Sequence, residues 1–268
     1  MNELKKKIWD DILQVRAQSP LVLNITNDVV MNNTANALLA AGASPIMTDE
    51  TEEIEDMVAL TAATVVNIGT LKRETVAAMK LALCKAAALG RPAVLDPVGA
   101  GATAYRNRVL SELLAAAPPA FVRGNAGEIM TLAGLAVESK GVDSTVGSTQ
   151  AEDSAVQLAR THSCVVSVSG ETDIITDGTH TVYVDNGDPM MTRVTGLGCT
   201  ASALVGAFAA VQPNRLAAAL SAAAFIAVCG EIATAESIGP GALQLNLYDV
   251  MYTLTEAQFM RTVQIRAK

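Results

Sequence analysis

Short apolar runs alternate with helical segments through the first 170 residues, and this alternation restricts the possible folds more than any other feature. The runs LVLNI (21–25), TVVNI (64–68) and CVVSVS (164–169) are apolar at nearly consecutive positions rather than at every second one. Strands of this kind are buried on both faces, as in a parallel sheet covered by helices on two sides. The sequence therefore predicts an α/β fold, with a mainly parallel central sheet between two layers of helices.

Helices are expected between these runs, where apolar residues recur with a helical period. Residues 4–18 place Leu4, Ile8, Ile12 and Val15 on one face, and Pro20 ends this helix. Glycine commonly ends a helix, and Gly42 and Gly90 are expected to end the predicted helices 33–41 and 74–89. The other predicted strands are 44–47, 92–96 and 120–123, and the other predicted helices are 33–41, 52–61, 74–89, 107–116 and 152–160, with a short one near Glu128.

The last third of the chain changes in pattern. The turn dipeptides Asp177-Gly178 and Asn186-Gly187 flank THTVYV, which predicts a local antiparallel ribbon. A strand-like run then leads into Gly196-Leu197-Gly198, and a helix is expected to begin at about residue 199 or 200, with a second Ala-rich helix after it. The polar stretch 135–150 is expected to be an exposed loop. No linker or internal repeat divides the chain, so residues 1–268 are expected to form a single domain.

Charge and composition restrict the partners. The net charge is -8 over 268 residues, with the acidic residues distributed along the chain, which argues against nucleic-acid binding. The apolar helix 216–230 is short for a membrane span and rich in Ala, so a buried helix is expected and no membrane partner. The charged N-terminus lacks a signal core, and the four cysteines lack disulfide or metal spacing. These features predict a cytoplasmic protein.

Ligands in open α/β sheets bind beyond the carboxyl ends of the strands, so the residues that follow each strand are the candidates for a site. The strongest candidate is VTGLGCTASALVGAF (194–208). Its glycines let the backbone approach a ligand, and the first amides of the following helix favour negative charge. Such amides could hold transferring phosphoryl oxygens. An ordinary glycine turn that packs a helix on a sheet explains this segment equally well when it is considered alone.

Charged side chains follow two other predicted strands. Asp96 ends PAVLD, where a carboxylate can hold Mg²⁺ directly or through water. In RGNAGE (123–128), Arg123 can grip phosphate oxygens and Glu128 can order a metal-bound water. Asn125 and Glu128 also fit a helix capping box, which leaves Arg123 unexplained. The capping and binding interpretations are compatible with each other.

Polar and soft side chains follow the remaining strands. Ser169 either offers a hydroxyl at the same sheet edge or only ends its strand, and Asn27 either binds a neutral polar ligand or serves the turn. Met47 could form an apolar wall for a ring, although a lone Met is more often core. The match GxGxxA at 99–104 is weak, because Pro97 disturbs the turn and no acidic ribose partner follows. No P-loop motif is present.

Taken in order, these segments resemble the hydroxyethylthiazole kinases, thiamine-salvage members of the ribokinase-like superfamily. The resemblance covers most of the chain, and the ordered set is far more specific than any single motif. It implies a ribokinase-like three-layer α/β/α sandwich and a homotrimer with active sites at subunit interfaces. The motifs are SPLVLNITNDVV (19–30), GASPIM (42–47), NIGTL (67–71), LDPVGAGAT (95–103), RGNAGEI (123–129), GVD (141–143), VSGETD (168–173) and VTGLGC (194–199).

The resemblance also implies an activity, which is ATP- and Mg²⁺-dependent phosphorylation of the hydroxyl of 5-(2-hydroxyethyl)-4-methylthiazole. Cys199 would stand where most ribokinase-like enzymes keep an aspartate base, and Gly198 would belong to the anion hole. Two departures are Ser169, where the family usually has Thr, and Leu197, where a small or polar residue is usual. The remaining implied roles are ATP contacts by Arg123, Ser169 and Asn125, Mg²⁺ contacts by Asp96 and Glu128, and thiazole contacts by Met47, Gly196, Asn27 and Val29.

Three alternatives stay open at this point. Another ribokinase-like kinase, such as a hydroxymethylpyrimidine kinase, would share the same motifs. A cysteine hydrolase using Cys199 needs a histidine base, and neither His162 nor His180 lies in a motif. A nucleotide-binding module without catalysis is the third. Within the kinase interpretation, Cys199 is expected to align or deprotonate the alcohol, because a thiol with a pKa of ~8.5 is a poor base at neutral pH.

Overall fold

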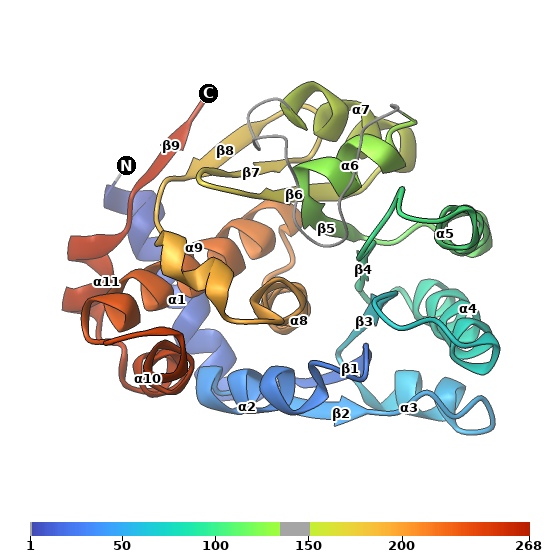
Figure 1. Cartoon of the computed structure of the whole chain (residues 1–268), viewed down its shortest axis with the longest axis horizontal. Helices are drawn as coiled ribbons and strands as arrows, with labels where there is room; N and C mark the ends of the chain where they lie inside the picture. Colours follow the sequence, from blue (N-terminus) through green and yellow to red (C-terminus); the bar gives the residue numbers. More distant parts are fainter. Residues whose placement is uncertain (1, 135–150) are drawn as a thin grey trace.

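A nine-stranded sheet forms the centre of the protein, which a computed structural model describes over residues 2–134 and 151–268 (Figure 1). The strand order is β2-β1-β3-β4-β5-β6-β7-β8-β9, parallel from β2 to β6 and antiparallel from β6 to β9. The predicted parallel sheet and antiparallel ribbon are therefore confirmed. The strands are β1 Leu21–Ile25, β2 Ser44–Met47, β3 Ala63–Asn67, β4 Ala93–Asp96, β5 Phe121–Asn125, β6 Val165–Ser169, β7 Asp173–Thr176, β8 Thr181–Val184 and β9 Ile265–Ala267.

Helices cover both faces of this sheet, which confirms the three-layer arrangement (Figure 1). Alternate residues of each inner strand point to opposite layers, so Val65 and Val66 enter different cores. One layer holds α1 Asn2–Gln18, α2 Met31–Ala41, α8 Leu197–Val211, α9 Arg215–Ala235, α10 Pro240–Thr253 and α11 Glu256–Thr262, and the other holds α3 Ile54–Leu60, α4 Arg73–Ala88, α5 Ala104–Ala116, α6 Ala126–Leu132 and α7 Glu152–His162.

Small residues bring α8 close to the sheet. A Cβ atom on Gly206 would lie 2.7 Å from Cγ2 of Val65, so a larger residue would push the helix outward. Aromatic residues make up only 3% of the chain, and Ala residues supply much of the contact between α8 and α9. This close packing sets how near the first turn of α8 lies to the carboxyl-terminal edge of the sheet.

The structure corrects three expectations from the sequence. The segment that leads into Gly196 is not a strand but the 3₁₀-helix η2 (Pro189–Arg193). Asp188 caps this helix, and Pro189 is suited to its first turn. The helix α8 begins at Leu197, two or three residues earlier than predicted. Helix α9 has 21 residues, so it is long and apolar enough to cross a membrane and is not short as predicted; 78% of its most apolar stretch is buried inside the protein, which confirms the predicted buried helix. The predicted loop 135–150, which includes the GVD motif, lies outside the described residues.

Candidate active site

The predicted site residues meet at the carboxyl-terminal edge of the parallel strands. In the register of the sheet, Asn67 of β3 lies beside Asp96 of β4, and Asn125 of β5 lies beside Ser169 of β6. Arg123 precedes Asn125 by two residues and therefore points to the same face. The sheet alone thus brings together the side chains that the sequence placed after three separate strands.

Asp96 is the most deeply buried acid at this edge, with 1% of its surface exposed. Its Oδ2 accepts hydrogen bonds from Asn67 Nδ2 at 2.6 Å and from Ser202 Oγ of α8 at 2.7 Å. Burial raises the pKa of Asp96, while the charge of Arg123 and the two donors oppose that rise. The carboxylate is therefore held in one orientation by donors from β3 and from α8.

Glu128 forms the capping box that the sequence suggested. Its Oε2 accepts from the amide of Asn125 at 2.8 Å, and Asn125 Oδ1 accepts from the amide of Glu128 at 3.0 Å. The other oxygen, Oε1, accepts from the amide of Gly99 at 2.8 Å and so ties down the loop after β4. Burial, and then the charge of Asp96, raise the pKa of Glu128 to about 7.

The first turn of α8 faces Arg123. Gly196 is the N-cap residue with φ 83°, and as a glycine it supplies no side-chain cap to this helix. A Cβ atom on Gly196 would lie 2.5 Å from Cγ1 of Val30, and one on Gly198 would lie 2.9 Å from Nη1 of Arg123. The guanidinium therefore lies close to the first turn of α8, whose amides donate to no side chain among the described residues. This is an arrangement that suits an anion.

Cys199 lies in the same turn. Its Sγ accepts a hydrogen bond from Asn27 Nδ2 at 3.3 Å. Burial, and then the charge of Asp96, raise the pKa of Cys199 to about 12. The side chain is therefore a protonated thiol at neutral pH, which favours a role in aligning a ligand over a role as a base.

The other predicted site residues, Ser169, Met47 and Val29, make weaker contacts or are more exposed. Ser169 Oγ donates to the carbonyl of Gly124 at a long 3.5 Å. Met47 is half-buried at the end of the edge strand β2, beside Asn24 of β1. Val29 has 64% of its surface exposed, so only a small part of it packs against this chain.

Three side chains at this edge, Asn67, Ser202 and Asp173, were not among the site residues predicted from the sequence. Asn67 lies in the quoted segments TVVNI and NIGTL, and its position at a strand end was the same signal that singled out Asp96. Ser202 follows Cys199 by three residues, a spacing that places both on one helix face. Asp173 is the third, and burial raises its pKa to about 6 although the amide of Gly170 donates to it.

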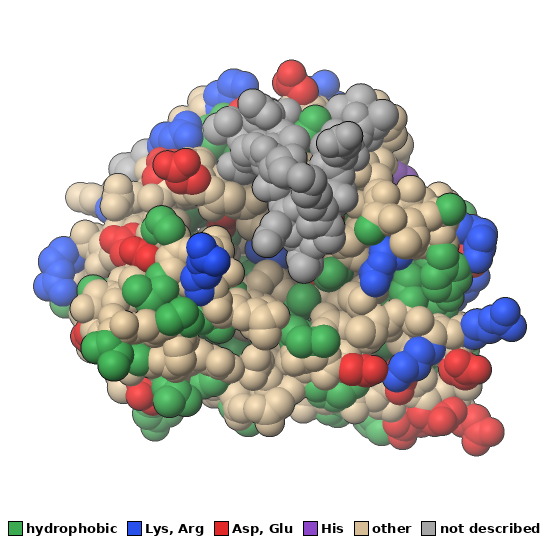
Figure 2. Space-filling model, viewed as in Figure 1, with side chains coloured by type: hydrophobic (Ala, Val, Ile, Leu, Met, Phe, Trp, Pro, Cys, Tyr) green, Lys and Arg blue, Asp and Glu red, His purple; other side chains and the backbone are tan. Residues whose placement is uncertain are grey.

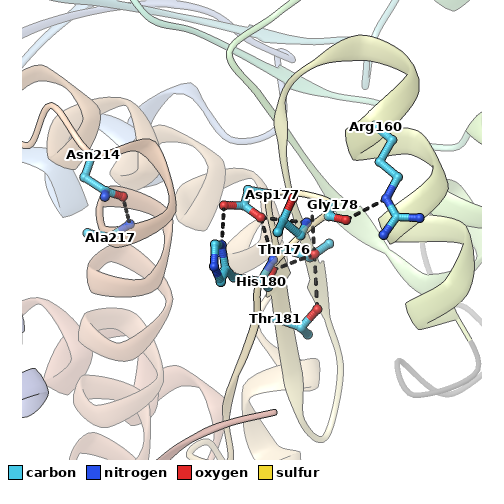
Figure 3. A network of polar contacts seen from close by, with 9 residues as sticks. Arg160, Thr176, Asp177, Gly178, His180, Thr181, Asn214 and Ala217 are labelled. Atoms are coloured by element: carbon cyan, nitrogen blue, oxygen red, sulfur yellow. Dashed lines mark hydrogen bonds and ion pairs between the residues drawn. The ribbon is translucent and has the colours of Figure 1, made fainter.

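Two surface cavities lie at the opposite edge, where the parallel strands begin. Their volumes are about 540 and 590 Å³, and they share Ser163, Pro213 and Arg215 in their lining. Figure 3 shows polar contacts beside the first cavity, where His180 contacts Asp177 and Arg160 donates to the carbonyl of Gly178. None of the predicted site residues lines either cavity.

Within residues 2–134 and 151–268, no group of three or more His, Cys, Asp or Glu side chains is arranged to hold a metal ion. The carboxylates available at the site edge are Asp96 and Glu128, each with a raised pKa. A metal ion at this edge would therefore depend on oxygens from a ligand or from water for most of its coordination.

A parallel sheet covered by helices on both faces, with an arginine and a helix start at its carboxyl edge, places the protein in the ribokinase-like fold class. The fold agrees with the pyridoxal kinase from Staphylococcus aureus in complex with AMP-PCP and pyridoxal, with a TM-score of 0.64, 14% identity, and coverage of 93% of this chain and 98% of the other. At that identity the likeness concerns the fold only.

Closer relatives define the family. Residues 12–257 match the model of the hydroxyethylthiazole kinase family, and the chain belongs to that family. It is 50% identical to a hydroxyethylthiazole kinase of Syntrophus aciditrophicus (strain SB) over 260 residues, which is 97% of this chain and 96% of the relative. A relative of the same name from Leptospira biflexa is 50% identical over 93% of each chain. The structure of the hydroxyethylthiazole kinase protein from Pyrococcus horikoshii OT3 has a TM-score of 0.91 and 41% identity, covering 98% of this chain and 99% of that one.

Proposed function

We propose that this protein transfers the γ-phosphoryl group of ATP to the hydroxyl of 5-(2-hydroxyethyl)-4-methylthiazole. The observation that carries this proposal is the contact between Arg123 and the uncapped first turn of α8, next to the Cys199 thiol. Membership of the hydroxyethylthiazole kinase family supports the choice of substrate. The reaction would belong to thiamine salvage.

The phosphate groups would lie at the start of α8. Phosphoryl transfer passes through a loose transition state, so that alignment and charge neutralisation matter more than covalent chemistry. The amides around Gly198 and the guanidinium of Arg123 would supply fixed positive charge, in an arrangement that needs no reorganisation during the reaction. Ser169 and Asn125, at neighbouring strand ends, would contact other parts of ATP.

Mg²⁺ would be held near Asp96 and Glu128. The two carboxyls are buried, and the charge of Asp96 contributes to the raised pKa of Glu128, so a divalent cation nearby would relieve their repulsion. Both oxygens of Glu128 already accept backbone hydrogen bonds, so Glu128 would act on the ion through water. When bound, the ion would offset charge on the phosphate oxygens.

The alcohol would bind between β1 and α8. Asn27 and Cys199 are in contact there, and Gly196 packs on Val30 beside them. Met47 and Val29 would complete the thiazole pocket as apolar walls. Cys199, a thiol with a pKa of about 12, would align the hydroxyl and would not act as a covalent nucleophile.

We further infer a cytoplasmic homotrimer with active sites at subunit interfaces, without a nucleic-acid or membrane partner. Exposed apolar side chains support an association surface: Leu39 on α2, and Leu245 and Tyr252 on the neighbouring α10. Figure 2 shows apolar side chains gathered at the lower left, over these helices. Light scattering of the purified protein should give three times the chain mass of 27.8 kDa, and a monomer mass would contradict the trimer.

A substrate panel with ADP release as the readout tests the proposed function. We expect Mg²⁺-dependent ADP formation with 5-(2-hydroxyethyl)-4-methylthiazole, and much slower formation with hydroxymethylpyrimidine. Preference for the pyrimidine would favour the alternative ribokinase-like kinase. ATP binding without turnover on any alcohol would indicate a binding module, and hydrolase activity lost on mutation of His162 and His180 would indicate a cysteine hydrolase.

A further inference from the structure

A continuous chain of side-chain hydrogen bonds links the Asp96 carboxylate to the Cys199 thiol. Asn67 Nδ2 donates to Asp96 Oδ2 at 2.6 Å, and Asn27 Nδ2 donates to Asn67 Oδ1 at 3.0 Å. The same Asn27 nitrogen contacts Cys199 Sγ at 3.3 Å. Asn67 and Asn27 are both buried, with 1% and 4% of their surfaces exposed. Leaving a buried polar group without a hydrogen-bond partner costs free energy, so these linked side chains have little freedom to rearrange.

Two neighbours fix which way the Asn67 amide points. Oδ2 of Asp96 accepts a hydrogen bond from Asn67 Nδ2, so the NH₂ group of Asn67 faces this carboxyl group. The amide of Gly69 can only donate, and it contacts Asn67 Oδ1 at 2.9 Å. A flipped Asn67 would lose both bonds and place like groups against each other.

The orientation of Asn67 then fixes that of Asn27. Because Asn67 presents its oxygen, Asn27 must present its NH₂ group, whose two hydrogens go to Asn67 Oδ1 and Cys199 Sγ. Gly69 holds this side chain from the other side, since a Cβ atom on Gly69 would lie 2.7 Å from Asn27 Nδ2. In the described part of the chain, no donor contacts Asn27 Oδ1. This oxygen is the one acceptor that Asn27 has left for a ligand.

We propose that Asn67 is a positioning residue, which makes Asn27 Oδ1 the acceptor for the O–H of the substrate alcohol. This inference rests on the proposed function and deepens it. A hydroxyl that donates its proton to Asn27 Oδ1 keeps both oxygen lone pairs free, and its oxygen lies beside Cys199 at the first turn of α8. The site would thereby prefer an alcohol over a substrate analogue of equal size that cannot donate a hydrogen bond.

Binding measurements test this preference without relying on turnover. The probes are 5-(2-hydroxyethyl)-4-methylthiazole and its 2-chloroethyl analogue, which lacks the O–H donor, with Kd from calorimetry. One hydrogen bond is worth about 0.5–1.5 kcal/mol, so the wild type should prefer the alcohol by about 2- to 12-fold. Asn67→Ala and Asn27→Ala should both lose this preference, while Asn36→Ala, an exposed asparagine on α2, should keep it.

A second variant guards against a folding defect. Gly69→Ala removes no hydrogen-bonding group but displaces Asn27, and it should lower the preference and kcat while leaving the KM for ATP unchanged. A folded Asn67→Ala protein that keeps the full alcohol preference would overturn the positioning role alone. A wild type that binds neither probe would overturn the proposed function, and this inference with it.

Discussion

The substitution Gly198→Ala separates the anion hole from the stability of α8. A Cβ atom at this position would lie 2.9 Å from Nη1 of Arg123. Non-bonded heavy atoms are most stable at about 3.5–4.0 Å, so the guanidinium must move by roughly 0.5–1 Å. The backbone of Gly198 does not have a positive φ, so alanine itself causes no strain there.

The expected cost follows from that displacement. A misplacement of about 1 Å in a positioning group can cost about 10²-fold in rate. We therefore expect kcat/KM for ATP to fall by about 10- to 100-fold, equivalent to about 1.4–2.7 kcal/mol of transition-state stabilisation. Alanine is about 1 kcal/mol more favourable than glycine within a helix, so the free energy of unfolding should stay the same or rise.

A coupled ADP-release assay and a urea titration measure the two effects separately. Gly241→Ala in α10 is the matched control, because that site is exposed and a Cβ atom there would have no neighbour within 4 Å. The control should keep wild-type kinetics. Full activity in Gly198→Ala would refute the idea that Arg123 and this turn act together on the phosphate.

Three further predictions follow from the same contacts. Cys199→Ser should lower kcat by much less than the ~10²–10⁴-fold expected for loss of a general base; complete loss of turnover, together with a phospho-cysteine trapped in the wild type, would contradict this. Glu128 has a pKa of about 7 in the folded protein against an ordinary value of 4.5, so the folded state binds this proton more tightly than the unfolded state does. The metal-free protein should therefore lose up to about 3 kcal/mol of stability as the pH rises from 4.5 through 7, a loss that should be absent in Glu128→Gln; equal pH slopes in thermal melts would count against it. Ser221→Ala removes the 2.6 Å donor to buried Asp11 and should cost about 1.5–3 kcal/mol in urea unfolding without changing kcat, whereas Ser111→Ala on the surface should cost little.

The strands could be predicted because their signal is local. Consecutive apolar residues in β1, β3 and β6 place each strand within one or two residues of its observed bounds. The run before Gly196 misled this reasoning, because Asp188 and Pro189 start a 3₁₀-helix that apolar content does not reveal. The capping box of Thr255 and Gln258 was a readable signal for α11, although that helix was not predicted.

The site could be predicted only in part, since its key contacts are distant in sequence. Asp96 ends β4 and Arg123 lies within β5, two residues before its end, so a search of the strand ends found both, but Ser202 reaches Asp96 across 106 positions. Asn67 became visible as a partner of Asp96 only when the strand register placed them side by side. The high pKa of Cys199 depends on burial and on Asp96, neither of which a sequence motif specifies.

A crystal structure with a non-hydrolysable ATP analogue, Mg²⁺ and the thiazole alcohol would test most directly where phosphoryl transfer takes place. We expect the γ-phosphate within hydrogen-bonding distance of the Gly198 and Cys199 amides and of the Arg123 guanidinium, with the alcohol oxygen in line beside Cys199. Phosphates bound at the opposite edge near Arg215, or an alcohol turned away from α8, would contradict the proposed function.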